Sequence, residues 1–180
     1  SGGFNDPFLK NGKEIEKGHL RRMKKIIEAC DTREMVVVVG IFYQRVMADF
    51  NGVRHIDDAE GVKNAVRSVA KALRGHKNII LNIANEQNSG YYKRCDFFNF
   101  NDPKEIIGLC RLAKSANPAL IVGAGGYHDD SNVTLGLSPA VDVLLFDTYD
   151  LDAQNGQHSQ WHYDYFVRNG VKGKPIVNVE

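Results

Sequence analysis

The sequence predicts a parallel α/β fold, because strand-like apolar runs alternate with amphipathic helix patterns along the chain. The five apolar runs are nearly continuous instead of alternating with polar residues, which is typical of parallel strands covered on both faces. A helix between successive parallel strands requires right-handed crossovers within one sheet. An open doubly wound sheet and a barrel both satisfy this order.

The first predicted element is a helix, because apolar residues from Leu20 to Cys30 recur at helical spacing. A second helix follows from the spacing of Val62, Val66, Val69 and Leu73. The strands are expected at five ranges, which are Met35–Phe42, Asn78–Ala84, Ala119–Gly123, Val141–Phe146 and Pro175–Val179.

The later helices carry clear start and stop signals. Asp102 is a good N-cap, Pro103 suits the first turn, and Glu105 places a carboxylate in that turn. A further helix is expected to begin at Ser159 and end near Gly170, with Trp161 on its apolar side. No linker or low-complexity tract interrupts the pattern, so residues 1–180 are interpreted as a single domain.

The composition is that of a soluble globular protein and argues against several classes of partner. The 180 residues are 43% hydrophobic and 25% charged, with a net charge of +1, so no overall field attracts nucleic acid or an anionic membrane. The longest apolar run, from Met35 to Tyr43, is far shorter than the roughly 20 residues of a membrane span. Cys30, Cys95 and Cys110 have neither metal-ligand spacing nor an even count and are expected to be reduced structural thiols.

The ends of the predicted strands are unusually polar. Chemistry gathers at the carboxyl ends of parallel strands in both candidate architectures. These ends offer Tyr43 and Gln44, then Asn85 and Glu86, then Tyr127 and His128, then Asp147 and Tyr149, and finally Glu180. Two carboxyl groups that face each other across a cleft can act as general acid and nucleophile, which is the arrangement that glycoside hydrolysis uses.

Two segments, "NIANEQN" and "KPIVNVE", resemble the strand-4 Asn-Glu motif and the strand-7 glutamate of retaining clan A glycoside hydrolases, in particular the cellulase-like family 5. The resemblance implies a (β/α)8 TIM barrel in which Glu86 is the acid/base, Glu180 the nucleophile and Asn85 a partner of the sugar 2-hydroxyl. Tyr149 matches the tyrosine placed against the nucleophile, whereas Asp147 stands where such enzymes often carry histidine. Because a whole barrel takes about 250 residues, the resemblance implies a partial barrel covering about strands 3 to 7, without strands 1, 2 and 8.

The resemblance also implies an oligosaccharide or polysaccharide as the binding partner, no cofactor, and, for a polymeric substrate, a secreted or periplasmic location. His128 and Tyr127 are interpreted as substrate-binding residues at the rim, although the "HDD" cluster that contains His128 can also simply form a turn. The aromatic loop after the strand Asn78–Ala84 contains Tyr91 and Tyr92, and its rings either stack on sugar rings or anchor the loop to the fold. Trp161 either lines the opposite rim or packs in its helix.

Other readings of the same residues stay open. A non-catalytic carbohydrate-binding barrel would keep the aromatic loop without turnover, and an open-sheet α/β enzyme of unrelated chemistry would use residues 85–88 to bind a polar ligand at a switch point. The "HIDD" and "HDD" clusters lack a metal-ligand framework, and "GAGG" lacks the third glycine of a dinucleotide loop. No metal site is therefore predicted.

Overall fold

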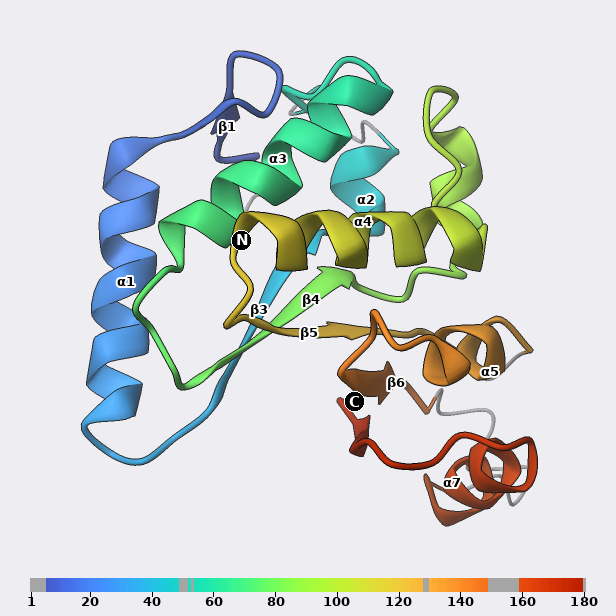
Figure 1. Ribbon diagram of the computed structural model, residues 1–180. Helices are drawn as coiled ribbons and strands as arrows, with labels where there is room; N and C mark the ends of the chain where they lie inside the picture. Colours follow the sequence, from blue (N-terminus) through green and yellow to red (C-terminus); the bar gives the residue numbers. More distant parts are fainter. Residues whose placement is uncertain (1–5, 49–51, 53, 128–129, 149–158, 180) are drawn as a thin grey trace.

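The computed structural model describes residues 6–48, 52, 54–127, 130–148 and 159–179, and its centre is one parallel sheet (Figure 1). The five strands lie in the order β3-β4-β5-β6-β7, and each is parallel to its neighbours. Their bounds are Val37–Phe42, Ile79–Ala84, Ile121–Ala124, Val143–Phe146 and Ile176–Asn178. The five strands predicted from the apolar runs are therefore confirmed, and so is their parallel arrangement.

The helices follow the strands in turn and form a continuous layer along the sheet. Helices α3, α4, α5 and α7 come after β3, β4, β5 and β6, and each contacts the next one. The bounds are Lys17–Asp31 for α1, Ala59–Ala72 for α3, Pro103–Ala116 for α4, Asp130–Leu137 for α5 and Ser159–Arg168 for α7. The predicted start of α4 is confirmed, because the Asp102 carboxylate accepts a hydrogen bond from the Lys104 backbone at 2.8 Å.

Several short elements were not predicted. A hairpin precedes α1 and pairs β1 (Phe8–Leu9) with β2 (Glu14–Ile15), while α2 (Gln44–Met47) and the 3-10 helix η2 (Gly90–Arg94) follow β3 and β4. Two-residue strands and single helical turns are too short to show a hydrophobic period. Their conformations come from tertiary contacts that a sequence window does not contain.

The two faces of the sheet have different surroundings. Alternate residues of β4, such as Leu81 and Ile83, are fully buried beneath the helices. Val38 and Ile121 project from the other face, since both pair with Ile80 in register, and they are 45% and 42% exposed. This second face corresponds to the interior of a barrel, and β3 and β7 are the two edges of the sheet.

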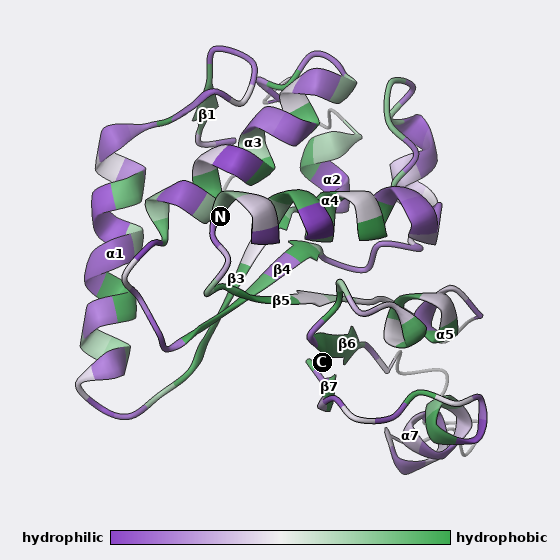
Figure 2. Cartoon of the chain, in the orientation of Figure 1, coloured by the Kyte–Doolittle hydropathy of each residue, from purple (hydrophilic) through white to green (hydrophobic). Residues whose placement is uncertain are grey.

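Figure 2 shows where hydrophobic and hydrophilic residues lie in the sheet and in the helices. Strand β6 is uniformly apolar and all four of its residues are buried, whereas α1 has mixed colouring because only part of its surface packs on the sheet. Within the described residues, no helix has both the length and the hydropathy needed to cross a bilayer.

All three cysteines are free thiols, as the sequence predicts. Cys95 and Cys110 are buried and Cys30 is partly exposed. Burial raises the pKa of the Cys110 thiol to about 12, so this side chain stays protonated and behaves as a small apolar group.

Candidate active site

Glu86 lies directly beyond the carboxyl end of β4 in an unusual backbone conformation. The Asn85 backbone N–H donates to the Phe42 carbonyl at 2.9 Å, which extends the sheet pairing by one residue before the chain turns. At Glu86 the φ angle is +49°, and the side chain is only 9% exposed. A left-handed conformation at a non-glycine residue costs on the order of 1–2 kcal/mol and is characteristic of functional positions.

Three side chains from different parts of the chain donate hydrogen bonds to the Glu86 carboxyl group. The Tyr127 hydroxyl donates to Oε2 at 2.6 Å, and Gln44 Nε2 donates to the same oxygen. Asn85 Nδ2 donates to Oε1 at 3.1 Å. These donors follow β3, β4 and β5, so the parallel order of the strands brings them together. The arrangement explains why this strand ends in polar residues, because side chains from neighbouring strand ends donate hydrogen bonds to the buried Glu86 carboxyl group.

The Tyr92 hydroxyl binds the backbone next to Glu86. It donates to the carbonyl of Asn85 at 3.0 Å and to that of Phe42 at 3.3 Å. Burial raises the pKa of the Tyr92 phenol well above its usual value, and the nearby Glu86 carboxylate adds to the rise. The hydroxyl is therefore a permanent donor that ties the ends of β3 and β4 to each other.

The aromatic loop mostly anchors itself to the fold. The Tyr92 ring is 1% exposed and stacks on Phe100 at 4.6 Å between centroids, and Phe98 and Phe42 also pack against Phe100. The expectation that Tyr92 contacts a sugar is corrected by this burial, since no ring face is open to a ligand. Tyr91 is 46% exposed.

The position of Tyr127 is fixed by Asn132, which the sequence prediction missed, and by Asn88, which it named only within the polar segment 85–88. Asn88 accepts from the Tyr127 backbone N–H at 2.9 Å and donates to the Tyr127 carbonyl at 2.9 Å. Asn132 donates to the same carbonyl at 2.7 Å and also bonds the Gly126 backbone. A Cβ on Gly126 would lie 2.2 Å from Asn88 Oδ1, so only glycine allows this close approach.

Of the other predicted site residues, two lie in other parts of the described chain and three lie outside the described residues. Asp147 is 2% exposed at the end of β6, and its backbone N–H donates to the Gly126 carbonyl at 3.1 Å. Trp161 is half-buried in α7 and stacks on Tyr165 with 5.9 Å between ring centroids, as the helix-packing reading expected. The remaining three predicted residues, which the structure does not describe, are His128, Tyr149 and Glu180.

Strand β7 carries the chain to the position next to Glu180. The Val179 backbone N–H donates to the Phe146 carbonyl at 2.9 Å, so pairing with β6 continues to the residue before Glu180. Asn178 Nδ2 donates to the hydroxyls of Ser159 and Thr148 at 2.7 and 3.2 Å. The carboxyl end of β7 is therefore at the same edge of the sheet as Glu86, three strands along.

Gln44 is the residue of the cluster that sequence reasoning undervalued. The sequence marks it as one of several polar strand ends, and nothing in its local pattern separates it from the neighbouring Tyr43. Its contact with Glu86 joins residues that lie far apart in the chain. Only the register of β3 against β4 reveals it, with Phe42 paired to Ala84.

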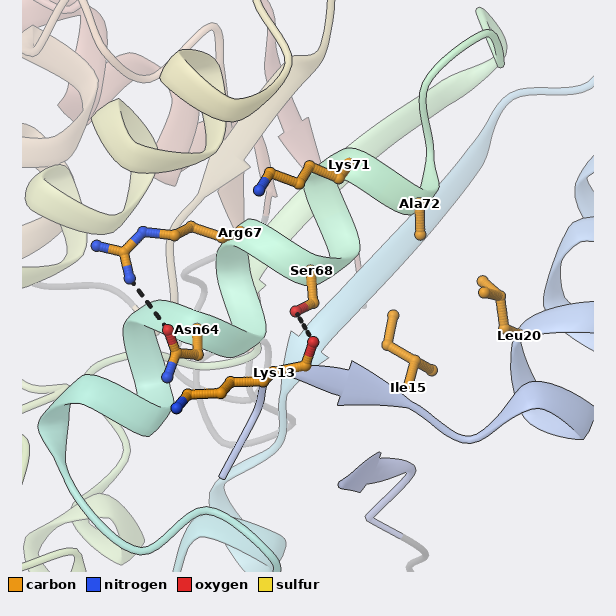
Figure 3. Close-up of a pocket in the computed structure, with 8 residues that line it drawn as sticks. All are labelled: Lys13, Ile15, Leu20, Asn64, Arg67, Ser68, Lys71 and Ala72. Carbon is orange, nitrogen blue, oxygen red and sulfur yellow. Dashed lines mark hydrogen bonds between the residues drawn. The ribbon is translucent and has the colours of Figure 1, made fainter. Parts of the chain in front are cut away.

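A depression of about 400 Å³ lies between β2, α1 and α3, and Glu86 is not among the residues that line it (Figure 3). Ser68 Oγ donates to the Lys13 carbonyl at 3.0 Å, and Arg67 pairs with Glu60 and Asn64. These polar groups already have hydrogen-bond partners within the chain. Among the described residues no three His, Cys, Asp or Glu side chains are grouped to hold a metal ion.

Comparisons with known proteins show a fold and not a family. No family model matches the sequence, and no curated protein matches it. A chitinase from Rhizomucor miehei has a TM-score of 0.60 at 13% identity, and the match covers 98% of this chain and 59% of the chitinase chain. A GH10 endoxylanase from a sugarcane soil metagenome has a TM-score of 0.59 at 10% identity, covering 96% of this chain and 55% of that one.

A β-1,4-mannanase from the sea hare Aplysia kurodai has a TM-score of 0.50 at 13% identity, covering 83% of this chain and 56% of that one. The chain thus spans between 55% and 59% of the length of these three solved structures. Its five-stranded parallel sheet is part of a TIM barrel, of the kind that these glycoside hydrolases share.

Proposed function

We propose that the protein is a retaining glycoside hydrolase that cleaves β-linked glycans, with Glu86 as acid/base and Glu180 as nucleophile. The observation that carries the proposal is the Glu86 carboxyl group, which is buried at the carboxyl end of β4 and receives three side-chain hydrogen bonds. A buried carboxyl group at this edge of a TIM-barrel sheet is typical of a catalytic acid or base. The likeness to three glycoside hydrolase structures supports the reaction class.

The proposed reaction has two steps. In the first, Glu86 transfers its proton to the glycosidic oxygen while the Glu180 carboxylate attacks the anomeric carbon, which releases the leaving alcohol and forms a glycosyl ester. In the second, the Glu86 carboxylate takes a proton from water, and the resulting hydroxide displaces Glu180. This mechanism requires the two carboxyl groups to lie about 5 to 5.5 Å apart.

The test is reducing-sugar release by the protein that carries this chain. The panel includes chitin, xylan and mannan, because chitinase, xylanase and mannanase are the solved structures that it resembles, together with β-glucan. Wild type is compared with Glu86→Gln, which keeps the shape of the side chain but has no acidic proton. We expect release from at least one polymer and a loss of at least about a hundredfold in Glu86→Gln.

Glu105→Gln is the matched control, because Glu105 is exposed in the first turn of α4 and takes no part in the cluster. It should retain wild-type activity. Glycan binding without release from any polymer would replace this proposal by the non-catalytic binding barrel. Full release by a folded Glu86→Gln variant would remove Glu86 from the mechanism.

A further inference from the structure

The Gln44 amide group has a hydrogen bond at its nitrogen and, within the described residues, none at its oxygen. Its Nε2 donates to Glu86 Oε2, and the side chain is 4% exposed. Its Oε1 is fully buried, and no donor among the described residues reaches it. A buried carbonyl oxygen without a donor is unfavourable, and a bound molecule that displaces the groups covering this atom would supply the missing hydrogen bond.

The two oxygens of Glu86 are not equivalent. Among the described residues, Oε2 receives hydrogen bonds from Gln44 and Tyr127, whereas Oε1 receives the longer bond of 3.1 Å from Asn85. In the protonated acid one oxygen becomes a donor and the other remains an acceptor. Two donors already face Oε2, so the acidic proton belongs on Oε1, and the bonds to Oε2 persist in both charge states.

The orientation of the Gln44 amide decides whether this arrangement is kept. Rotation by half a turn would place Gln44 Oε1 against Glu86 Oε2, and two acceptors face each other favourably only if the proton moves to Oε2. A ligand hydroxyl that donates to Gln44 Oε1 prevents the rotation. Bound ligand would therefore hold the acidic proton on the oxygen that faces away from Gln44.

We propose that Gln44 is a positioning residue for Glu86, in which Nε2 holds Glu86 Oε2 and Oε1 accepts a hydrogen bond from a hydroxyl of the bound glycan. The identity of the ligand rests on the proposed function. Among the described residues, the titratable groups near Glu86 include the phenols of Tyr127 and Tyr92. Gln44 is neutral and begins α2, two residues after the end of β3.

The test uses Gln44→Met, which has a similar shape but neither donor nor acceptor, in the protein that carries this chain. Gln87→Met is the matched control. Gln87 is 0% exposed and also has an unpartnered Oε1, but its Nε2 donates to Ser131 at 2.7 Å instead of to Glu86. Protonation of Glu86 is followed by the ¹³C NMR shift of its side-chain carboxyl group as the pH is varied.

In Gln44→Met we expect the Glu86 titration midpoint to rise by about one pH unit, because a hydrogen bond to a charged group changes the protonation equilibrium about tenfold. The basic limb of the hydrolysis profile should move in the same direction. Oligosaccharide affinity should fall by about tenfold through loss of the Oε1 acceptor. Gln87→Met should leave the midpoint and the profile unchanged.

An unchanged midpoint in folded Gln44→Met would overturn the positioning role, and a changed midpoint with unchanged affinity would overturn the contact with the ligand. The NMR titration does not depend on turnover. An inactive wild type would therefore count against the proposed function while the midpoint still decides the role of Gln44. If Gln44→Met does not fold, Gln44→Asn withdraws the amide by one methylene and is expected to raise the midpoint too.

Discussion

Replacing Tyr92 with phenylalanine tests how strongly the loop after β4 supports Glu86. The substitution removes one hydroxyl and leaves the ring stacked on Phe100 at 4.6 Å. That hydroxyl donates to the carbonyl of Asn85, the residue directly before Glu86, and to the carbonyl of Phe42. The perturbation is therefore confined to the connection between the ends of β3 and β4.

The expected loss of unfolding free energy depends on which hydrogen bonds the two carbonyl groups keep in Tyr92→Phe. The Phe42 carbonyl still accepts from the Asn85 backbone N–H at 2.9 Å, so its loss is small. The Asn85 carbonyl loses the bond of 3.0 Å to the hydroxyl. Loss of one buried hydrogen bond whose acceptor is left without that donor costs about 1–2 kcal/mol. Because the peptide before Glu86 is loosened, catalytic activity should fall more than stability alone explains.

The assay is urea unfolding of wild type and Tyr92→Phe, with hydrolysis measured on both proteins. Tyr91→Phe is the control, because Tyr91 is 46% exposed and its change should stay within about 0.5 kcal/mol. Equal unfolding free energies for the two variants would refute the idea that the Tyr92 hydroxyl anchors the end of β4. A loss of stability with no change in activity would show that the Tyr92 hydroxyl stabilises the fold but is not needed to position Glu86.

The remaining predictions concern stability. The free energy of unfolding should fall above pH 9, because the Cys110 thiol keeps its proton in the folded state, where its pKa is about 12, and loses it on unfolding near the ordinary value of 9.0. The slope should approach about 1.4 kcal/mol per pH unit and should be smaller in Cys110→Ala. Gly125→Ala should prevent folding or destabilise severely, since a Cβ there would lie 1.3 Å from the Leu145 carbonyl oxygen. Gly108→Ala, in the middle of α4 with no neighbour within 4 Å, should instead stabilise by up to about 1 kcal/mol in thermal unfolding.

The strands and long helices were predictable because their signals are local. Continuous apolar runs mark strands covered on both faces, and Asp102 with Pro103 marks the start of α4 before any contact is known. The observed strands begin one or two residues later than the apolar runs, for example at Val37 and not at Met35, which is 53% exposed. Hydrophobicity alone does not locate the first paired residue.

The cluster around Glu86 was predictable only in part. Asn85, Glu86 and Tyr127 follow strands, so the carboxyl-end rule brings them to one edge, and they do meet there. Gln44, Asn88 and Asn132 act through bonds to distant segments, which depend on register and loop conformation. Tyr92 shows the opposite error, since an aromatic residue in a long loop has the same sequence signature whether it meets a ligand or the core.

The most direct test of the two-carboxylate mechanism is the configuration of the products formed with azide. Glu86→Ala and Glu180→Ala are each incubated with azide and a β-aryl glycoside of the sugar identified by the polymer panel, and the glycosyl azide is assigned by proton NMR. If Glu86 is the acid/base and Glu180 the nucleophile, azide displaces the enzyme ester in Glu86→Ala to give the β-azide, and replaces the missing nucleophile in Glu180→Ala to give the α-azide. The reverse assignment, or an α-azide from both variants, would contradict the proposed roles.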